Sequence, residues 1–378
     1  MDDNIKNLPD ELFEEKTQEQ IFDENFKTKP TGYFKDSMRR LVKNKVSMVS
    51  LGLILFFIFM AIFAPLFNEF LYTQQHVAPR NLRNMPPRVP GLERFGILDG
   101  TRVVPNRRLE HVNDPEHFRQ SSIIEILNER VVAGVVMVDV RVNYYDFRDA
   151  NEMYFWFGSD NLGRDLFTRL FRGTRISLFI AFFSVFVNLI MGVVIGAVMG
   201  YYGDPVDMAL SRVIEVLIGI PNIVLIMMFI MMFGATIPVL VMAMCITGWV
   251  PVARLTRAQF YRFKVREFVL AARTLGVKDF ALIFRHIMPH SVGILITRTM
   301  LAIPLVIFTE SFLAYIGLGI RAPETSIGVM LSEAQQVLLQ FPYQMFFPSV
   351  VISVLMVSFN LLANGLSDAL DPPKRGEV

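Results

Sequence analysis

The chain is poor in the residue types that enzymes use for covalent and metal chemistry. Its 378 residues include one cysteine, Cys245, so the sequence offers neither an intrachain disulfide nor a cysteine-based metal site. No segment reads G-x-x-x-x-G-K-[S/T], the loop whose backbone amides hold ATP phosphates. Of the five histidines, only His286 and His290 are four residues apart, and Pro289 lies between them. We therefore expect no catalytic residues, no metal and no other cofactor.

An excess of one charge is also missing, whereas long apolar runs are abundant. Lys and Arg number 37 against 35 Asp and Glu, so net charge gives no indication of a nucleic acid partner. Hydrophobic residues make up 53% of the chain. The sequence predicts an all-α polytopic membrane protein, because six runs approach or reach the ~20 residues that cross a bilayer. These runs are 46–67, 176–201, 208–233, 237–252, 292–320 and 347–366.

Two of these runs carry signals for helix packing and shape. Gly192, Gly196 and Gly200 recur at four-residue intervals in the second run. Small residues at that spacing permit close helix–helix approach in lipid. Pro221 lies inside the third run, and we expect it to kink that span.

A polar island, residues 254–289, separates the fourth and fifth runs. Its only acidic residues are Glu267 and Asp279, whereas its basic residues are Arg254, Arg257, Arg262, Lys264, Arg266, Arg273, Lys278 and Arg285. An excess of Lys and Arg in a short loop marks the cytoplasmic side of a membrane protein. The basic residues just before the first run likewise predict a cytoplasmic tail over 1–45, and six spans return the tail 367–378 to the same side.

Apolar residues in the island recur at helical spacing on both sides of Gly276. The first pattern consists of Val265, Phe268, Val269, Ala272 and Leu275, and the second runs from Lys278 to Met288. Gly276 is typical of a helix end, where positive φ lets the chain satisfy the last carbonyls. Pro289 should stop the second helix from running straight on. The island is therefore predicted to be two short helices joined at a glycine.

Residues 68–160 form a long segment between the first two spans. Apolar residues at helical spacing predict a helix over 116–130, and alternating Val and polar residues predict a strand over 136–144. Long loops are largely exempt from the charge rule, so the Arg residues here do not oppose an external location. We predict a small α/β extracytoplasmic insert, followed by a core over 161–366.

Two features of that core each leave two interpretations open. Leu162, Leu166, Phe167, Leu170 and Phe171 lie on one face of a helix, and Arg164, Arg169 and Arg172 lie on another. Such a helix either lies in the membrane interface or packs on the outer domain. Glu310 lies deep in the fifth run, where an ionisable residue is a functional candidate by default. It either lines a translocation pathway or makes a structural hydrogen bond to a neighbouring helix.

Several segments resemble motifs of ABC importer permease subunits, and of their oligopeptide/dipeptide branch in particular. In the EAA loop of that family, Glu-Ala-Ala is followed after three residues by Gly and later by Pro. Here Ala271, Ala272, Gly276 and Pro289 match, and Leu270 replaces the Glu. Residues 157–165 resemble F-G-T-D-x-x-G-R-D, 310–319 resemble E-x-x-L-S-F-L-G-L-G, and 366–372 resemble the ending L-R-D-A-L-D-P. The motifs occur in the family's order.

The resemblance implies the six-helix fold of a type I ABC importer permease, in which the EAA loop is the coupling element that docks into a groove on an ATPase subunit. It gives that role here to Leu270, Ala271, Ala272, Arg273, Gly276, Val277, Phe280 and Pro289, and places the two alanines close to the ATPase surface. The implied partners are a second permease that completes a heterodimer, two ATPase subunits, and an extracytoplasmic substrate-binding protein. The implied location is a bacterial cytoplasmic membrane.

The resemblance also implies that the chain is not itself an enzyme and that peptides are its solute. Nickel complexes and glutathione are the alternatives within the same branch. The competing class is an ion-coupled secondary transporter with Glu310 as proton carrier, which inverted repeats would support. The sequence shows no clear repeat of that kind. A membrane-embedded enzyme is a third alternative.

Overall fold

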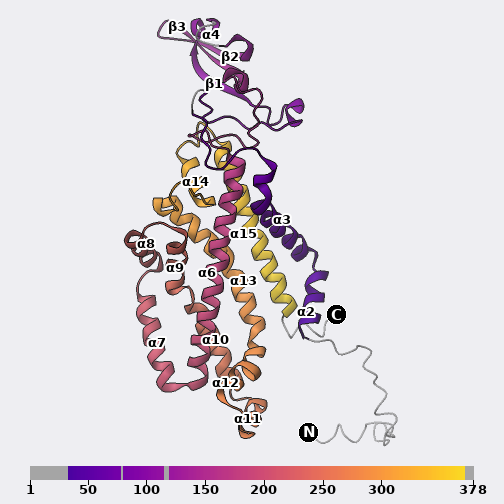
Figure 1. Ribbon diagram of the computed structural model, residues 1–378, viewed down its shortest axis with the longest axis vertical. Helices are drawn as coiled ribbons and strands as arrows, with labels where there is room; N and C mark the ends of the chain where they lie inside the picture. Colours follow the sequence, from indigo (N-terminus) through magenta and orange to yellow (C-terminus); the bar gives the residue numbers. More distant parts are fainter. Residues whose placement is uncertain (1–32, 78–79, 115–118, 371–378) are drawn as a thin grey trace, which may run out of the picture.

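The computed structural model describes residues 33–77, 80–114 and 119–370. Most of the N-terminal tail and all of 371–378 lie outside the described residues, and so do the predictions that concern them. The molecule is an elongated stack of helices with a small sheet at one end (Figure 1). The helices on which the argument depends are α2 Tyr33–Lys43, α3 Lys45–Phe67, α6 Leu166–Tyr202, α7 Asp204–Gly219, α8 Asn222–Phe233, α9 Ile237–Gly248, α10 Val250–Phe263, α11 Glu267–Thr274, α12 Asp279–Ala281, α13 Met288–Leu313, α14 Ile327–Gln335 and α15 Tyr343–Leu370.

Five helical stretches within the described residues are long and apolar enough to cross a membrane. They are Lys45–Phe67, Leu166–Tyr202, Ile237–Phe263, Asp279–Leu318 and Tyr343–Leu370. A sixth candidate exists only as the pair α7 and α8, which is bent by 79°. The expected third span is therefore broken rather than kinked. The cause is Pro221, because a proline disfavours the helical region for the residue before it, and Ile220 is extended with φ −96° and ψ 130°.

Pro289 does not end the helix that precedes it, so that expectation was wrong. A π-helical turn, Leu282–Ile287, comes directly before the proline, which lies in the first turn of α13. A wider turn removes the clash between a proline ring and the carbonyl one turn earlier. The helix consequently continues from α12 through α13, and the polar island is joined rigidly to the fifth span.

The glycine stripe of α6 packs against α10, as the four-residue spacing predicted. A Cβ built at Gly192 would lie 2.6 Å from Val252 Cβ, and one at Gly200 would lie 2.5 Å from Phe260 Cβ. Distances this short are not tolerated between real side chains, so only glycine permits this approach. The two helices therefore form one packed unit along the second half of α6.

The insert between α3 and α6 contains a three-stranded antiparallel sheet with the order β1-β3-β2. Its strands are β1 Thr101–Arg108, β2 Ile123–Val132 and β3 Val135–Asn143. The strand predicted over 136–144 is confirmed as β3, although Tyr144 already begins the short helix α5, Tyr144–Phe147. The helix predicted over 116–130 is wrong: 115–118 lie outside the described residues, and the rest is a 3-10 turn, Gln120–Ser122, followed by β2.

The local sequence explains why β2 is a strand. Ala133 and Gly134 both have positive φ, 49° and 80°, which is the two-residue hairpin turn that suits antiparallel strands. β-branched Ile and Val residues on β2 pair with β3, and Val138, Val140 and Val142 of β3 are fully buried in the core of the insert. Cross-strand packing therefore outweighs the helical spacing of the apolar residues.

Candidate coupling site and membrane cavity

Residues 254–263 of the polar island belong to α10 and so extend the fourth span. The rest of the island folds as two helical segments joined at Gly276, at the end of the molecule opposite the sheet (Figure 1). We call the segment 267–287 the coupling joint, after the role that the sequence predicts for it. Gly276 has φ 79°. Its amide donates to the Arg273 carbonyl at 2.9 Å, and the Val277 amide donates to the Ala272 carbonyl at 3.2 Å. This pair of bonds is the Schellman helix ending, which satisfies carbonyls that α11 leaves open. The sequence prediction of a glycine-ended helix here is confirmed.

One face of this joint packs inward and forms a small core of its own. Ala272 and Val269, three residues apart on α11, are buried. They pack with Phe260 of α10, Tyr201 of α6, and the π-helical residues Leu282, Ile283 and Ile287. Ala272 thus contacts the protein's own core, and its closeness to an ATPase surface stays a prediction. Ala271 is exposed.

The opposite face is open and unusually apolar. Leu275 is 85% exposed and Phe280 is 73% exposed, and the rings of Phe280 and Phe284 lie 4.6 Å apart. Leu270, Arg273 and Pro289 are also exposed, whereas Val277 is half-buried. We call Leu270, Leu275, Phe280 and Phe284 the tip surface. Large exposed apolar side chains on one short segment are typical of a site where another molecule docks.

The coupling joint is also tied to α6 by polar contacts. The Tyr201 hydroxyl donates to Asp279 Oδ1 at 2.5 Å, and the Arg273 guanidinium lies 5.5 Å from the centre of the Tyr201 ring. Tyr201 is one residue after Gly200, one of the glycines at which α6 packs closely against α10. These contacts hold the coupling joint against the end of α6.

A cavity of about 540 Å³ lies among the spanning helices, away from the coupling joint. Residues from α6 through α10 and from α13 line it, and most of the wall is apolar. Its polar lining residues are Asn188, Asn222, Thr247, Arg254, Arg298, Thr299 and Thr309. The sequence analysis did not single out this set, because its members come from six helices and share no motif.

Glu310 is not among the residues that line this cavity. It is 1% exposed, and Ser177 of α6 donates to its Oε2 at 2.9 Å. The Ser177 oxygen in turn accepts from the backbone amide of Ile327 at 3.3 Å, at the start of α14. Glu310 thus joins α13, α6 and α14. This arrangement favours a structural hydrogen bond over a position that lines a translocation pathway.

The arginines at the start of α6 form an ion cluster that sequence reasoning missed. Arg169 is 2% exposed and donates to both Asp160 and Glu333, the latter at 2.8 Å. Arg164 Nε donates to Asp160 Oδ2 at 2.7 Å. Leu166 and Phe167 are buried as well, so this segment is not an interfacial helix but the packed first turn of α6. No sequence signal pointed to Glu333, because it lies 164 residues from Arg169.

The described part of the chain holds no group of three or more His, Cys, Asp or Glu side chains that could bind a metal ion. Asp165 is the most perturbed acid that lies outside the spanning segments. It caps α6 by accepting from the Thr168 amide at 2.8 Å, and Asn68 donates to it at 2.9 Å. Burial nevertheless raises the pKa of Asp165 to about 6.

Known proteins resemble the chain along most of its length. Residues 192–376 match the family described as "Binding-protein-dependent transport system inner membrane component", and residues 32–87 match "N-terminal TM domain of oligopeptide transport permease C". The chain is 32% identical to "Dipeptide transport system permease protein DppC" of Bacillus subtilis (strain 168), over 97% of this chain and 94% of that protein. It is 31% identical to "Oligopeptide transport system permease protein OppC" of the same organism, over 98% and 100%.

A third relative carries a different solute in its name. The chain is 36% identical to "Glutathione transport system permease protein GsiD" of Pectobacterium atrosepticum, over 61% of this chain and 77% of that protein. The first family match includes the whole coupling joint, the cavity residues of α7 through α10 and α13, and Glu310. The similarity therefore includes the parts of the molecule that the geometry singles out.

Proposed function

Because this chain belongs to the OppC/DppC-type permeases of binding-protein-dependent ABC transport systems, we propose that it forms one half of a translocation pathway for peptides. The chain is a multi-pass inner membrane protein and a permease subunit, and it is not itself the ATPase. Its half of the pathway is completed by a second, different permease. Two ATPase subunits and an extracytoplasmic substrate-binding protein complete the importer.

The observation that carries this proposal is the tip surface of the coupling joint. Leu275 and Phe280 remain largely exposed, although full burial would stabilise each side chain by roughly 1.5–3 kcal/mol. Arg273 and Lys278 lie beside them and suit acidic groups at the edge of a groove. An ATPase groove that is apolar inside and acidic at its edge is therefore the complementary partner.

The packing above the joint supports a mechanical role. The helix from α12 to α13 is continuous, α6 and α10 touch at glycines, and Tyr201 ties α6 to Asp279. Packed elements of this kind move as rigid bodies, not by gradual deformation. Closure of the ATPase pair would thus rock the spans and alternate access to the pathway.

The cavity among α6 through α10 and α13 supplies the wall of the pathway. Its amide and hydroxyl groups can hydrogen-bond to the backbone groups common to all peptides, while Arg254 and Arg298 suit a terminal carboxylate. The large apolar part of the cavity wall does not select among peptides by the chemistry of their side chains. Glu310 lies outside this wall, so the proton-carrier hypothesis gains no geometric support.

The distribution of charge supports a location of the coupling joint inside the cell and of the sheet outside it. The basic residues of the island and those of α2 lie on the same side of the spanning helices, opposite the insert (Figure 1). The positive-inside rule then makes that side cytoplasmic. Both tails are proposed to be cytoplasmic on the same ground.

Reconstitution tests the energy source and the solute together. The chain would be purified in mild detergent with the subunits that accompany it, placed in liposomes with the binding protein, and assayed with labelled peptides of two to five residues, glutathione and a nickel chelate. We expect uptake of a peptide that requires ATP and all subunits. Uptake driven by a proton gradient in the chain alone would overturn the proposal, and uptake of glutathione or nickel only would replace its solute.

A further inference from the structure

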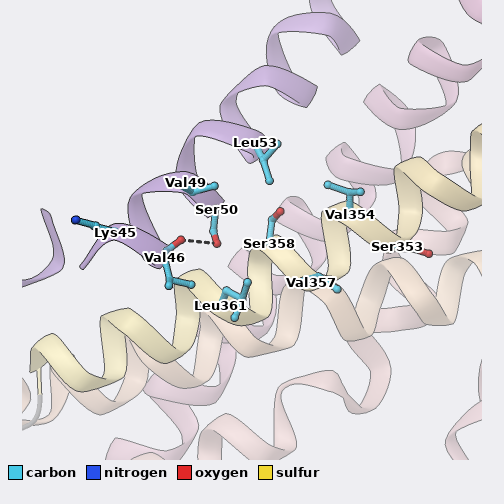
Figure 2. Close-up of a pocket in the computed structure, with 10 residues that line it drawn as sticks. All are labelled: Lys45, Val46, Val49, Ser50, Leu53, Ser353, Val354, Val357, Ser358 and Leu361. Atoms are coloured by element: carbon cyan, nitrogen blue, oxygen red, sulfur yellow. Dashed lines mark hydrogen bonds between the residues drawn. The ribbon is translucent and has the colours of Figure 1, made fainter. Parts of the chain in front are cut away.

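A groove of about 550 Å³ runs between the first half of α3 and the middle of α15 (Figure 2). Its walls are almost entirely carbon, and the Ser50 hydroxyl beside it is already donated to the Val46 carbonyl at 2.8 Å. The groove therefore suits an alkyl chain and offers little to a polar solute. The side chains that define it are Lys45, Val49 and Leu53 from α3 and Val354, Val357 and Leu361 from α15.

One end of this groove carries positive charge. Lys45 is the first residue of α3 and lines the groove at one end, which we call the mouth, with its ammonium group directed away from the apolar side chains (Figure 2). On the preceding helix α2, Lys35, Arg39 and Lys43 are exposed and follow each other at four-residue spacing, so they lie in one row along the helix. None of these four side chains forms an ion pair with another described residue. A basic row with no ion-pair partner among the described residues thus lies on the helix that directly precedes the groove.

The placement of α2 suits the surface of a bilayer. Its residues Ser37 and Leu41 are buried, and the helix packs against α15. Met38 and Val42 are exposed beside the basic row. A helix that combines exposed apolar residues with a row of Lys and Arg lies along the membrane interface and attracts anionic lipid.

From this juxtaposition we propose that the groove binds one acyl chain of an anionic phospholipid. Lys45, Lys43 and Arg39 hold the lipid phosphate at the mouth, and Val49, Leu53 and Val357 contact the chain. A molecule with one anionic head and an alkyl tail matches both halves of the site. A protein partner would have to present a narrow apolar segment that ends in an acidic group.

Native mass spectrometry of the full chain, with the subunits that accompany it, tests the site with defined lipids. Phosphatidylglycerol and phosphatidylcholine with identical chains would be added in turn to delipidated protein. We expect one phosphatidylglycerol to be retained preferentially over phosphatidylcholine. Each lysine near an anionic surface contributes about a fivefold effect on binding. We therefore expect Lys43→Gln with Lys45→Gln to weaken retention roughly twentyfold and to leave phosphatidylcholine unaffected.

The controls separate charge at this site from charge elsewhere. Arg80→Gln with Arg83→Gln removes two exposed charges from the insert at the other end of the molecule and should leave retention unchanged. Val357→Phe fills the groove and should reduce retention of both lipids. If the Val357→Phe protein folds poorly, the lysine variants still test the proposal. Equal retention of the two lipids, or no effect of the lysine pair, would overturn the proposal. A photocrosslink from position 357 to a protein subunit and not to lipid would also overturn it.

Discussion

At the scale of single residues, the shape of the coupling joint depends on Gly276. Its positive φ directs two amides back to the Arg273 and Ala272 carbonyls, so α11 stops without an unsatisfied end. The position is otherwise open, since a Cβ there would meet no atom within 4 Å. A substitution therefore acts through backbone strain and through what the new side chain does to a docking partner.

Gly276→Arg should leave the chain in the membrane and abolish uptake. The strain of a side chain at positive φ is about 1 kcal/mol, too little to unfold the protein, whereas the arginine would project into the docking surface. Gly134→Arg is the matched control, because Gly134 has φ 80° and an equally open position in the hairpin of the insert. Membrane abundance, ATPase copurification and peptide uptake would be measured for both. Normal uptake by Gly276→Arg would show that this joint does not couple to the ATPase.

Neighbouring alanines on α11 should respond in different ways to the same change. Ala272→Glu places a carboxylate in the core of the joint, at a cost of roughly 2 kcal/mol or more, and should make the segment from α11 to α12 sensitive to protease. Ala271→Glu lies on the exposed side and should keep that segment resistant while it weakens ATPase copurification. Equal protease sensitivity of the two variants would contradict the inward orientation of Ala272.

At the scale of elements, α6 joins the two ends of the molecule. Its first turn belongs to the ion cluster of Asp160, Arg169 and Glu333, and its last turn contacts the coupling joint through Tyr201. The buried Arg169 matters for stability mainly because removing it would leave the Asp160 charge without its full compensation, a change that costs about 3–5 kcal/mol. The outer ends of α6 and α14 are thereby fixed to each other.

The N-cap of α6 should make stability depend on pH. Burial raises the pKa of Asp165 to about 6, against about 3.9 in the unfolded chain. Between these pH values the folded state holds more protons than the unfolded state. The contribution of Asp165 to the free energy of unfolding therefore falls as pH rises from 4 to 6. The loss is about 3 kcal/mol above pH 6. Asp165→Asn keeps a capping oxygen without the charge. The amount by which its thermal stability in detergent exceeds that of the wild type should therefore grow as pH rises from 4 to 6.

Asp146 provides a control of opposite sign. A hydrogen bond from Ser121 lowers the pKa of Asp146 below its usual value. Its contribution to stability is therefore present above the unfolded pKa and is lost as pH falls. Asp146→Asn should lose stability relative to the wild type at neutral pH and approach it at low pH. A constant difference between wild type and Asp165→Asn across pH 4–7 would contradict the burial of the Asp165 charge.

The elements that sequence patterns predicted well are those whose signal is local. Hydropathy located five spans, and the spacing of Gly192, Gly196 and Gly200 identified a close helix contact. The errors arose where a distant partner decides the structure. β2 is a strand because β3 pairs with it.

The candidate sites were likewise hard to predict from the sequence wherever a residue far away in the chain completes them. Arg169 turns inward because Asp160 and Glu333 are there to receive it. The Gly276 joint could be predicted, because a helix ending is encoded within a few residues, whereas the cavity wall is assembled from six helices.

At the scale of the whole molecule, the sheet and the coupling joint lie at opposite ends of the helical stack (Figure 1). An importer needs this separation, since solute arrives at one membrane surface and ATP is hydrolysed at the other. The basic island and the basic row on α2 lie on the same side of the spanning helices. That asymmetry is what orients the chain in the bilayer.

Cysteine labelling tests this orientation directly. In a Cys245→Ser background, which removes the only native thiol, Ser121→Cys reports on the insert and Lys278→Cys on the coupling joint. Both positions are exposed, so a difference in labelling reflects sidedness and not burial. An impermeant thiol reagent added to spheroplasts should label Ser121→Cys only, and both variants should be labelled after the membrane is made permeable. If Lys278→Cys is labelled from outside, the joint cannot meet a cytoplasmic ATPase, and the coupling proposal fails with the orientation.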